Sequence, residues 1–305
     1  MNTKLIRFDW AMKKILRNKA NFGILEGFLS ELLKFDITIE NILESEGNKE
    51  EQYDKYNRVD ILVKSDKGEL MLVEVQNDSE IDYFHRMLYG VSKLVTEYIK
   101  EGEPYGSIRK VYSINIVYFG LGQGKDYVYE SKNEFIGLHE KDILKPTIIQ
   151  RADYLVEQVS DIFPRYYILK INNFNDVAKN TLDEWIYFLK NSEVKEGFKA
   201  KGLDKAKEKL QYEALSEKEK KKYVRFQENR RIEQSVKYTA IAEAKLAGKL
   251  EGRKEGRKEG KLEGKLEGKS EIAKNAIKKN FDNQTISELT GLTIEEIEKL
   301  RQKNN

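Results

Sequence analysis

The sequence predicts an α/β core followed by an all-helical C-terminal region. Two short segments rich in Val, Ile and Leu, residues 59–63 and 70–76, flank a turn-forming stretch that contains Gly68. This pattern is typical of a β-hairpin. Before the hairpin, apolar residues recur at spacings of three and four, as on one face of a helix. After residue 172 the pattern becomes helical throughout, so we expect the strands to lie before it.

Residues 4–34 are predicted to be helical, most clearly over residues 22–33. Five apolar side chains form one stripe there: Phe22, Leu25, Leu29, Leu32 and Leu33. With Phe22 set to zero, the stripe spans roughly 280° to 20° at about 100° per residue. Glu26 falls at about 40°, at the edge of the stripe, and Glu31 falls at about 180°. We therefore expect Glu26 to point toward the core and Glu31 to lie on the surface.

The predicted hairpin brings two acidic residues together. If the hairpin is symmetric about Lys67, residue i faces residue 134 − i, and Asp60 lies directly opposite Glu74. Facing side chains in an antiparallel pair have Cβ atoms about 4.5–5.5 Å apart. Two carboxylates in an apolar hairpin repel each other and are costly to desolvate. A bound cation is the usual reason for such a pair, and Mg²⁺ is the natural choice because it prefers oxygen ligands.

Further elements are predicted after the hairpin. A helix is expected from about Glu80 to Lys100, and strands are expected at residues 111–119, 135–138 and 166–171. The apolar face of the helix is predicted to consist of six residues: Ile81, Phe84, Leu88, Val91, Val95 and Ile99. Its polar face would carry Arg86, Tyr89, Lys93 and Lys100. Arg86 and Lys93 are candidates for phosphate contacts, with a solvated surface position as the alternative.

The C-terminal part contains a four-residue repeat of the form Glu-Gly-Lys/Arg-Lys/Leu over residues 251–268. Glycine weakens a helix, whereas the Glu/Lys spacing of three favours one slightly. A helical spacer or self-association arm and a flexible linker are therefore both open. Residues 271–301 are predicted to form a small helix-turn-helix-like module with a Thr293–Glu296 capping box. Its last helix is acidic at its start, which argues against base reading.

Composition adds limits on location and partners. The 305 residues include no Cys, so we expect a reducing, cytoplasmic location without disulfides. No run of about 18 apolar residues occurs, so a soluble protein without a membrane partner is expected. Residues 195–237 contain 14 Lys and Arg against 8 Asp and Glu, and residues 245–269 contain 9 against 5. With a net charge of +3, the remainder carries −7. This asymmetry suits an acidic catalytic part that holds a polyanion through a basic second half, or else solvated helices alone.

Taken together, these residues resemble the PD-(D/E)XK nuclease superfamily, in which a metal-binding Asp and an (Asp/Glu)-X-Lys motif occupy adjacent strands. Within it, the chain is similar to the bacterial recombination-promoting nuclease (Rpn) and transposase group. Four stretches carry this resemblance: Phe8–Lys14, Asn57–Leu62, Val73–Asn77 and Tyr83–Tyr89. The resemblance implies a restriction-endonuclease-like core, with a mixed central sheet flanked by helices, and a DNA substrate.

The resemblance also implies roles for individual residues. Asp60, Glu74 and the backbone carbonyl of Val75 would bind Mg²⁺, for which Mn²⁺ substitutes, and Glu26 would match a helix glutamate that helps to orient the metal and its water. Gln76 stands where the superfamily usually has Lys. Glutamine can orient water or donate a hydrogen bond to phosphate, but it brings no positive charge.

Three hypotheses follow for the function. The first is a Mg²⁺-dependent DNA endonuclease linked to recombination or mobile elements. The second is a catalytically weak or inactive nucleic-acid-binding or regulatory protein on a nuclease fold, and the third is a scaffold that forms homo-oligomers through the C-terminal helical and Gly-repeat region. The predicted parts are a core (1–172), a basic helical region (173–244), the repeat spacer (245–270) and the terminal module (271–305).

Overall fold

The computed structural model describes residues 5–14, 16–43, 59–98, 104–108, 110–154 and 156–302, and it divides into two compact units. The first unit runs to Lys221 and contains all of the described strands, and the second begins at Lys222. None of the helices in these ranges combines the length and apolar composition needed to cross a bilayer.

The first unit contains a mixed six-stranded sheet with the order β1-β2-β3-β4-β6-β5. The strands are β1 (Ile39–Leu43), β2 (Val59–Ser65), β3 (Leu70–Gln76), β4 (Val111–Val117), β5 (Val128–Glu130) and β6 (Arg165–Lys170). The β3–β4 and β4–β6 pairs are parallel and the others are antiparallel. This confirms the predicted α/β class with a mixed central sheet, although β1 and β5 were not predicted from the sequence.

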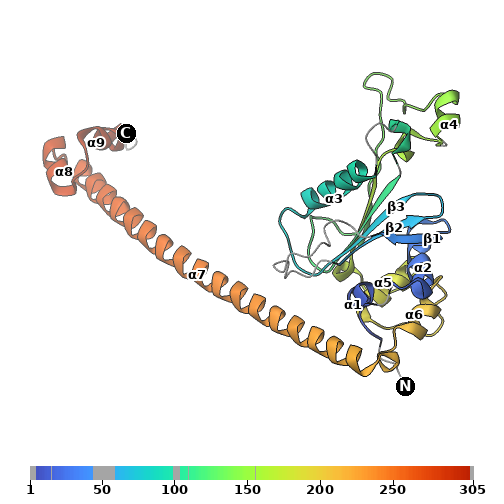
Figure 1. Cartoon of the computed structure of the whole chain (residues 1–305). Helices are drawn as coiled ribbons and strands as arrows, with labels where there is room; N and C mark the ends of the chain where they lie inside the picture. Colours follow the sequence, from blue (N-terminus) through green and yellow to red (C-terminus); the bar gives the residue numbers. More distant parts are fainter. Residues whose placement is uncertain are drawn as a thin grey trace. The chain divides into compact units, whose positions relative to one another are not determined.

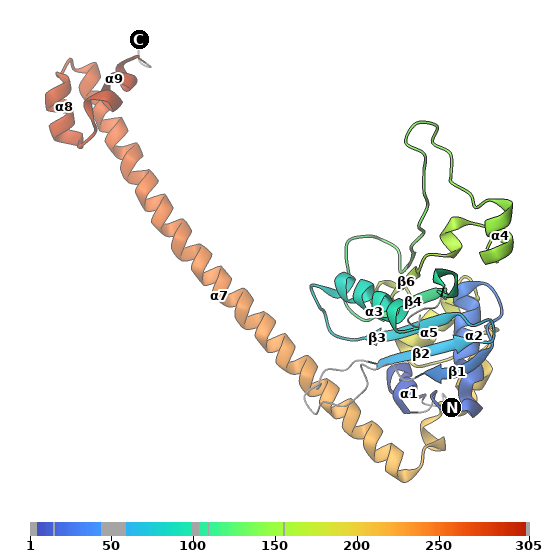
Figure 2. The same ribbon diagram turned by 45° about the horizontal axis from the view of Figure 1, so that its top comes forward.

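Helices cover both faces of the sheet (Figure 1). The helix α3 (Tyr83–Glu97) lies on one face, and three further helices lie on the other: α1 (Phe8–Lys14), α2 (Phe22–Leu33) and α5 (Thr181–Asn191). The predicted helix over residues 4–34 is interrupted, because the short 3-10 helix η1 (Lys19–Asn21), capped by Asn18, precedes α2. Figure 2 shows β1, β2 and β3 side by side, with β1 at the edge of the sheet.

An aromatic cluster holds α1, α2 and α5 together. Trp185 is fully buried, and its ring contacts those of Phe8, Phe28 and Phe188 edge-on at centroid distances of 6.2, 5.5 and 5.7 Å. Edge-to-face aromatic pairs stabilise a core beyond the area that they bury. Because α5 contributes to this cluster, the compact unit extends beyond residue 172, the predicted boundary of the core.

The helix α6 (Leu203–Lys209) also belongs to this layer, and its approach to α2 depends on two glycines. A Cβ on Gly27 would lie 2.2 Å from the backbone oxygen of Lys201, so only glycine permits this contact. Gly202 sits opposite with a φ of +83°, a conformation that favours glycine. The contact therefore adds a helix that the predicted core had excluded.

A long extension separates β5 from β6. It includes the short helix α4 (Ile148–Tyr154) and the 3-10 helix η4 (Val159–Asp161). The strand predicted at residues 135–138 is not formed; only an isolated bridge joins Ile136 to Ile143. The apolar side chains that suggested a strand are exposed here: Phe135, Ile136 and Leu138.

The rest of the first unit consists of short 3-10 helices: η3 (Tyr105–Ser107), η5 (Ile171–Asn173) and η6 (Tyr212–Ala214). The second unit contains most of α7 (Glu217–Lys278), followed by α8 (Asn283–Thr290) and α9 (Ile294–Gln302). The glycine repeat lies within α7, so these residues are helical. Glycines four residues apart advance about 40° around a helix, so the glycines from Gly248 to Gly268 wind about 200° around α7 and share no single face.

The terminal module forms around a small core that includes Ala273, Ile286 and Ile297. The predicted Thr293–Glu296 capping box is confirmed: the backbone N–H of Thr293 donates to the Glu296 carboxylate at 2.8 Å, and that of Glu296 donates to the Thr293 hydroxyl at 3.3 Å. Three large apolar side chains of the module are exposed: Phe281, Leu289 and Ile294.

Candidate active site

The hairpin has the predicted register. Asp60 is the Cα partner of Glu74, and the other pairs of β2 and β3, from Val59–Val75 to Lys64–Leu70, follow the same rule. The turn closes with a hydrogen bond from Gly68 N–H to the Ser65 carbonyl at 2.9 Å. The side chain of Asp60 lies outside the described part of the chain. The backbone nevertheless places its position opposite the glutamate, on the same face of the sheet.

Glu74 and Gln76 are buried on the face of β3 that α3 covers. Alternate residues of a strand share one face, and Leu70 on β3 packs with Val91 and Leu94 of α3. Glu74 and Gln76 continue that row toward the end of the strand, with relative exposures of only 5% and 3%. A carboxylate and an amide thus enter a largely apolar layer.

The helix α3 is rotated relative to the sequence prediction. Its buried residues are Tyr83, Met87, Val91 and Leu94. Phe84 and Leu88, which were predicted to face the core, are exposed, and Ile81 lies before the helix and is fully exposed. The predicted residues Ile99 and Lys100 lie outside the described part. This correction matters because it moves Arg86, predicted on the solvated face, to the edge of the buried stripe, with a side-chain exposure of 16%.

Arg86 links the buried glutamate to a second carboxylate. Its guanidinium forms an ion pair with Glu74. Its Nη1 also donates to both carboxylate oxygens of Glu80 at 2.9 Å. The guanidinium carbon lies 5.4 Å from the centroid of the Tyr83 ring, within cation–π range. One arginine is therefore held between two carboxylates and an aromatic face.

Gln76 completes this network and offers an oxygen to the site. Its Nε2 donates to Glu80 at 2.9 Å and to the backbone carbonyl of Asp78 at 3.2 Å. Its Oε1 is buried and accepts no hydrogen bond within the described part of the chain. The Gln76 NH₂ group, which the sequence suggested as a donor to phosphate, is thus already bonded within the protein. The atom that can still form a hydrogen bond is the acceptor Oε1.

The oxygen atoms of Glu74 and Gln76 are of the type that binds a hard divalent cation. A buried carboxylate and an amide oxygen without a donor are ligand types that Mg²⁺ and Mn²⁺ accept. Among the described residues no three His, Asp or Glu side chains converge as a complete metal site. Asp60 is the predicted second carboxylate ligand, and its side chain lies outside the described residues. Val75 packs its side chain into the core, and a metal contact by its backbone carbonyl stays a sequence prediction.

On the β4 side, the neighbour of Glu74 is a fully bonded amide. Asn115, the Cα partner of Glu74, is buried and donates to Ser113 at 2.9 Å and to the Tyr167 carbonyl at 3.1 Å. Its oxygen accepts from the Tyr83 hydroxyl at 3.2 Å. Asn115 therefore fixes Tyr83, and through it the ring on which Arg86 rests.

The structure does not bring Glu26 to this cluster. Its Oε1 accepts from the backbone N–H of Ile39 at 2.9 Å, and Ile39 pairs with Ser65 at the hairpin end of β2. Ser65 lies five positions along β2 from Asp60, a distance of roughly 17 Å. The helix α2 that carries Glu26 also covers the opposite face of the sheet (Figure 1). A metal role for Glu26 stays a sequence prediction that this arrangement does not support.

Lys93 lies on α3 two turns beyond Arg86. It is half-exposed and forms an ion pair with Glu97 at 3.2 Å. Residues seven apart in a helix share a face at a spacing of about 10 Å. The two predicted phosphate contacts are therefore on the same side of α3, Arg86 next to the buried cluster and Lys93 farther along.

Sequence reasoning missed Glu80 and Asp9. Glu80 follows Gln76 by four residues, but only the turn into α3 brings the two together. Asp9, at the start of α1, is 2% exposed and accepts from Asn77 Nδ2 at 3.2 Å, from the N–H of Trp10 at 2.8 Å and from Arg7. The sequence signal for Asp9 was its place in Phe8–Lys14, a stretch that the resemblance had already singled out.

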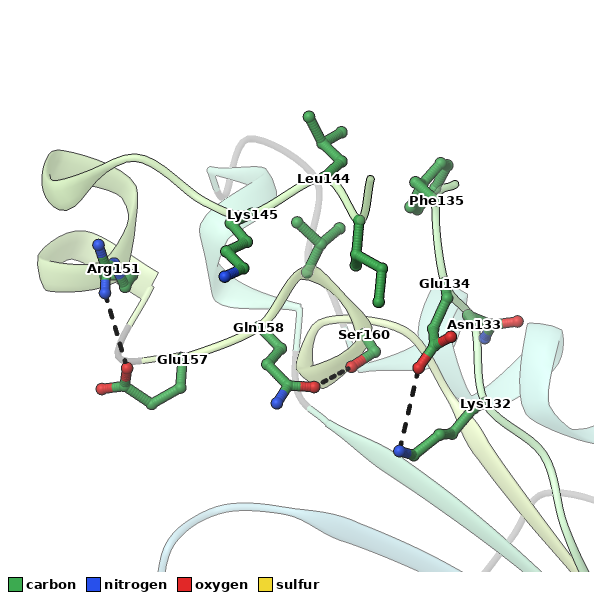
Figure 3. Close-up of a pocket in the computed structure, with 12 residues that line it drawn as sticks. Lys132, Asn133, Glu134, Phe135, Leu144, Lys145, Arg151, Glu157, Gln158 and Ser160 are labelled. Atoms are coloured by element: carbon green, nitrogen blue, oxygen red, sulfur yellow. Dashed lines mark hydrogen bonds and ion pairs between the residues drawn. The ribbon is translucent and has the colours of Figure 1, made fainter. Parts of the chain in front are cut away.

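A pocket of about 410 Å³ lies elsewhere, within the extension between β5 and β6 (Figure 3). Four of its charged lining residues form two ion pairs: Lys132 with Glu134 and Arg151 with Glu157, each at 3.9 Å. None of the residues of the Glu74 cluster lines it. The pocket therefore does not contribute to the candidate active site.

Comparison with known proteins supports the assignment that the geometry suggests. A family model described as PD-(D/E)XK nuclease family transposase matches residues 6–240, which span the whole sheet and its covering helices. No curated protein and no solved structure matches the chain. The matched region includes the Asp60–Glu74 pair, Gln76 and Arg86, and the chain belongs to the PD-(D/E)XK nuclease family transposases.

Proposed function

We propose that the chain is a metal-dependent endonuclease that hydrolyses phosphodiester bonds of DNA, with Mg²⁺ as its ion. The observation that carries this proposal is the register of β2 and β3, which sets Asp60 opposite a buried glutamate. A buried carboxylate is costly unless it is paired or coordinates a metal, and a single arginine, Arg86, faces both Glu74 and Glu80. Membership of a nuclease and transposase family supports DNA as the substrate and recombination or mobile-element activity as the context.

Each residue of the cluster has a proposed task. Asp60 and Glu74, with the backbone carbonyl of Val75, would hold the ion. A divalent ion bound there would make a water molecule a stronger nucleophile and offset negative charge on the attacked phosphate. The amide oxygen of Gln76, which no described donor satisfies, would accept a hydrogen bond from that water and orient it.

DNA would approach along the exposed side of α3. Arg86 and Lys93 would contact successive backbone phosphates there, and such contacts position a duplex without reading its sequence. The basic residues of 195–237 and 245–269 would add affinity that falls as salt concentration rises.

Cleavage of supercoiled plasmid in Mg²⁺ or Mn²⁺ tests this function. The wild-type protein should nick or linearise the plasmid, and Asp60→Ala and Glu74→Ala should each abolish cleavage because each removes a metal ligand. Glu40→Ala is a matched control, since Glu40 is an exposed carboxylate on β1 that pairs with Lys64. If wild type and both site variants cut equally, the cleavage comes from a contaminant and the proposal fails.

A second function is favoured by Gln76. Without a lysine at this position, and with Arg86 paired to the metal-binding carboxylate, the chain would bind DNA as a regulatory protein and turn over slowly or not at all. This predicts salt-sensitive DNA binding without metal-dependent cutting. Gln76→Lys distinguishes the two, because a new ammonium beside Glu80 should raise the rate of a weak enzyme and leave a non-catalytic protein silent.

A further inference from the structure

Gln76 stands at the position where the superfamily usually has lysine. A cation from another element, Arg86, lies beside Glu74 instead. Arg86 reaches Glu74 from α3, and Glu80 holds it by two hydrogen bonds of 2.9 Å. Gln76 donates to the same Glu80 at 2.9 Å. Gln76 is thus connected to the arginine through one shared carboxylate.

The charges of this cluster imply a competition. Glu74 and Glu80 contribute two negative charges and Arg86 contributes one positive charge, all within hydrogen-bond or ion-pair distance. A divalent cation on Glu74 would share that carboxylate with the guanidinium, and like charges at such short range repel strongly. The arginine can release Glu74 without losing its partners, because Glu80 and the Tyr83 ring still hold it.

We propose that Arg86 is a catalytic residue that takes over the electrostatic role of the missing lysine. In the metal-free protein it neutralises Glu74, and when the ion and DNA bind it exchanges Glu74 for a non-bridging oxygen of the attacked phosphate. Glu80 is the positioning residue that keeps the guanidinium in place during this exchange. The inference rests on the proposed nuclease function and identifies the cation that this site uses.

The geometry of arginine suits this exchange. A guanidinium carries five N–H donors in a planar fork, so it can keep one carboxylate on Nη1 while another nitrogen contacts a phosphate. Its position on α3, next to the strand end that bears Glu74 and Gln76, places the charge close to the reacting phosphate. A merely structural arginine would instead tie α3 to β3 in every state.

A catalytic and a structural Arg86 predict opposite changes in metal affinity when the arginine is removed. Calorimetric Mn²⁺ titration of the full chain can measure this change. Arg86→Gln removes the competing cation, so Mn²⁺ should bind about tenfold more tightly. Glu80→Gln removes the carboxylate that holds Arg86 on its Nη1, so the guanidinium should bind Glu74 more strongly and Mn²⁺ should bind several-fold more weakly. A structural arginine predicts weaker Mn²⁺ binding in both variants, because the site would loosen.

Plasmid cleavage at saturating Mn²⁺ completes the test. Arg86→Gln should cut about 100-fold more slowly than wild type despite its tighter metal binding, the size of effect expected from losing one transition-state donor. Arg86→Lys keeps the charge and should retain more activity than Arg86→Gln. Arg165→Gln is the matched control: it is a partly buried arginine that pairs with Glu130 and Asp161, away from the cluster, and both measurements should stay at wild-type values.

The outcomes separate this inference from the function on which it rests. If wild type binds Mn²⁺ and cuts DNA, but Arg86→Gln binds Mn²⁺ no more tightly or cuts at the wild-type rate, the role of Arg86 is overturned and the nuclease function stands. If wild type neither binds Mn²⁺ nor cuts DNA, the nuclease function itself fails. Should Arg86→Gln not fold, Arg86→Lys decides: because it keeps the cation, its Mn²⁺ affinity should stay near the wild-type value and its cleavage should stay above background, and weaker Mn²⁺ binding would indicate a structural arginine.

Discussion

The layer formed by α1, α2 and α5 and the layer formed by α3 both bury charged groups, but they satisfy them differently. In the first layer, Asp183 is 2% exposed and accepts from the Tyr127 hydroxyl at 2.8 Å and from the Lys179 N–H at 2.9 Å. In the second layer, Glu74 shares one arginine with Glu80, and the oxygen of Gln76 accepts from no described donor.

We expect this difference to separate structural polar groups from functional ones. Buried polar atoms in native proteins are almost always hydrogen-bonded, so an acceptor left without a donor is informative. Each carboxylate oxygen of Asp183 accepts a hydrogen bond from the protein, whereas no described donor reaches the Gln76 oxygen. The following four predictions test whether this contrast marks a ligand site under α3.

The largest effect should come from the aromatic cluster of the first layer. Trp185→Ala removes a fully buried ring and its three edge-on contacts, so the free energy of unfolding should fall by about 3–5 kcal/mol. Urea denaturation would measure it. The folded fraction should keep wild-type Mn²⁺ affinity; a change in that affinity without loss of stability would contradict the separation of the two layers.

Glu74→Gln should strongly reduce function with a small effect on stability. Cleavage should fall by about 100- to 1000-fold because a metal ligand is lost. The free energy of unfolding should change by only about 1 kcal/mol, since Arg86 keeps Glu80 as its partner. Plasmid cleavage and urea denaturation on the same preparation provide both values. A large loss of stability would make Glu74 a structural residue.

Asp183→Asn is the matched carboxylate-to-amide change in the first layer, and the expected result is reversed. An amide has one acceptor oxygen, so it cannot replace both carboxylate oxygens, which accept from the Tyr127 hydroxyl and the Lys179 N–H. The free energy of unfolding should therefore fall by about 1–2 kcal/mol. Cleavage by the folded protein should stay within about twofold of wild type. Loss of cleavage here would remove the contrast with Glu74.

The smallest effect concerns Lys110, a half-buried cation that contacts neither Asp183 nor Glu74 in any described hydrogen bond or ion pair. Burial lowers the pKa of Lys110 to about 8, and its Nζ donates to the Ser160 and Phe163 carbonyls. The unfolded chain therefore binds more protons between about pH 8 and 10.5, so stability should rise with pH in that range, by about 1 kcal/mol after solvent screening.

Tyrosines set the upper limit of that rise. Burial raises the pKa of Tyr167 to about 12, so the unfolded chain loses this proton first and stability should fall above pH 10. Thermal unfolding at successive pH values should show a maximum near pH 10. Lys110→Met should remove the rise between pH 8 and 10 and keep the fall; an unchanged rise would mean that another group titrates.

Local patterns predicted the hairpin and its register correctly, because a two-residue period and a glycine turn specify which residues face each other. The α/β class, β4, β6 and the capping box at Thr293 follow from equally local signals. The helix α3 shows the limit of such signals. Its sequence offers two overlapping apolar stripes, and the choice between them depends on the groove that β3 and β4 present.

The sequence by itself determined that Asp60 faces Glu74, that Gln76 follows Glu74 on the same face of its strand and that the chain continues as helices beyond residue 172. Only the tertiary structure decided that Glu26 lies on the other face of the sheet and that Arg86 turns inward to Glu74 and Glu80. The physical reason is range: strand register is set by neighbours along the chain, whereas the rotation of a helix is set by the surface on which it packs.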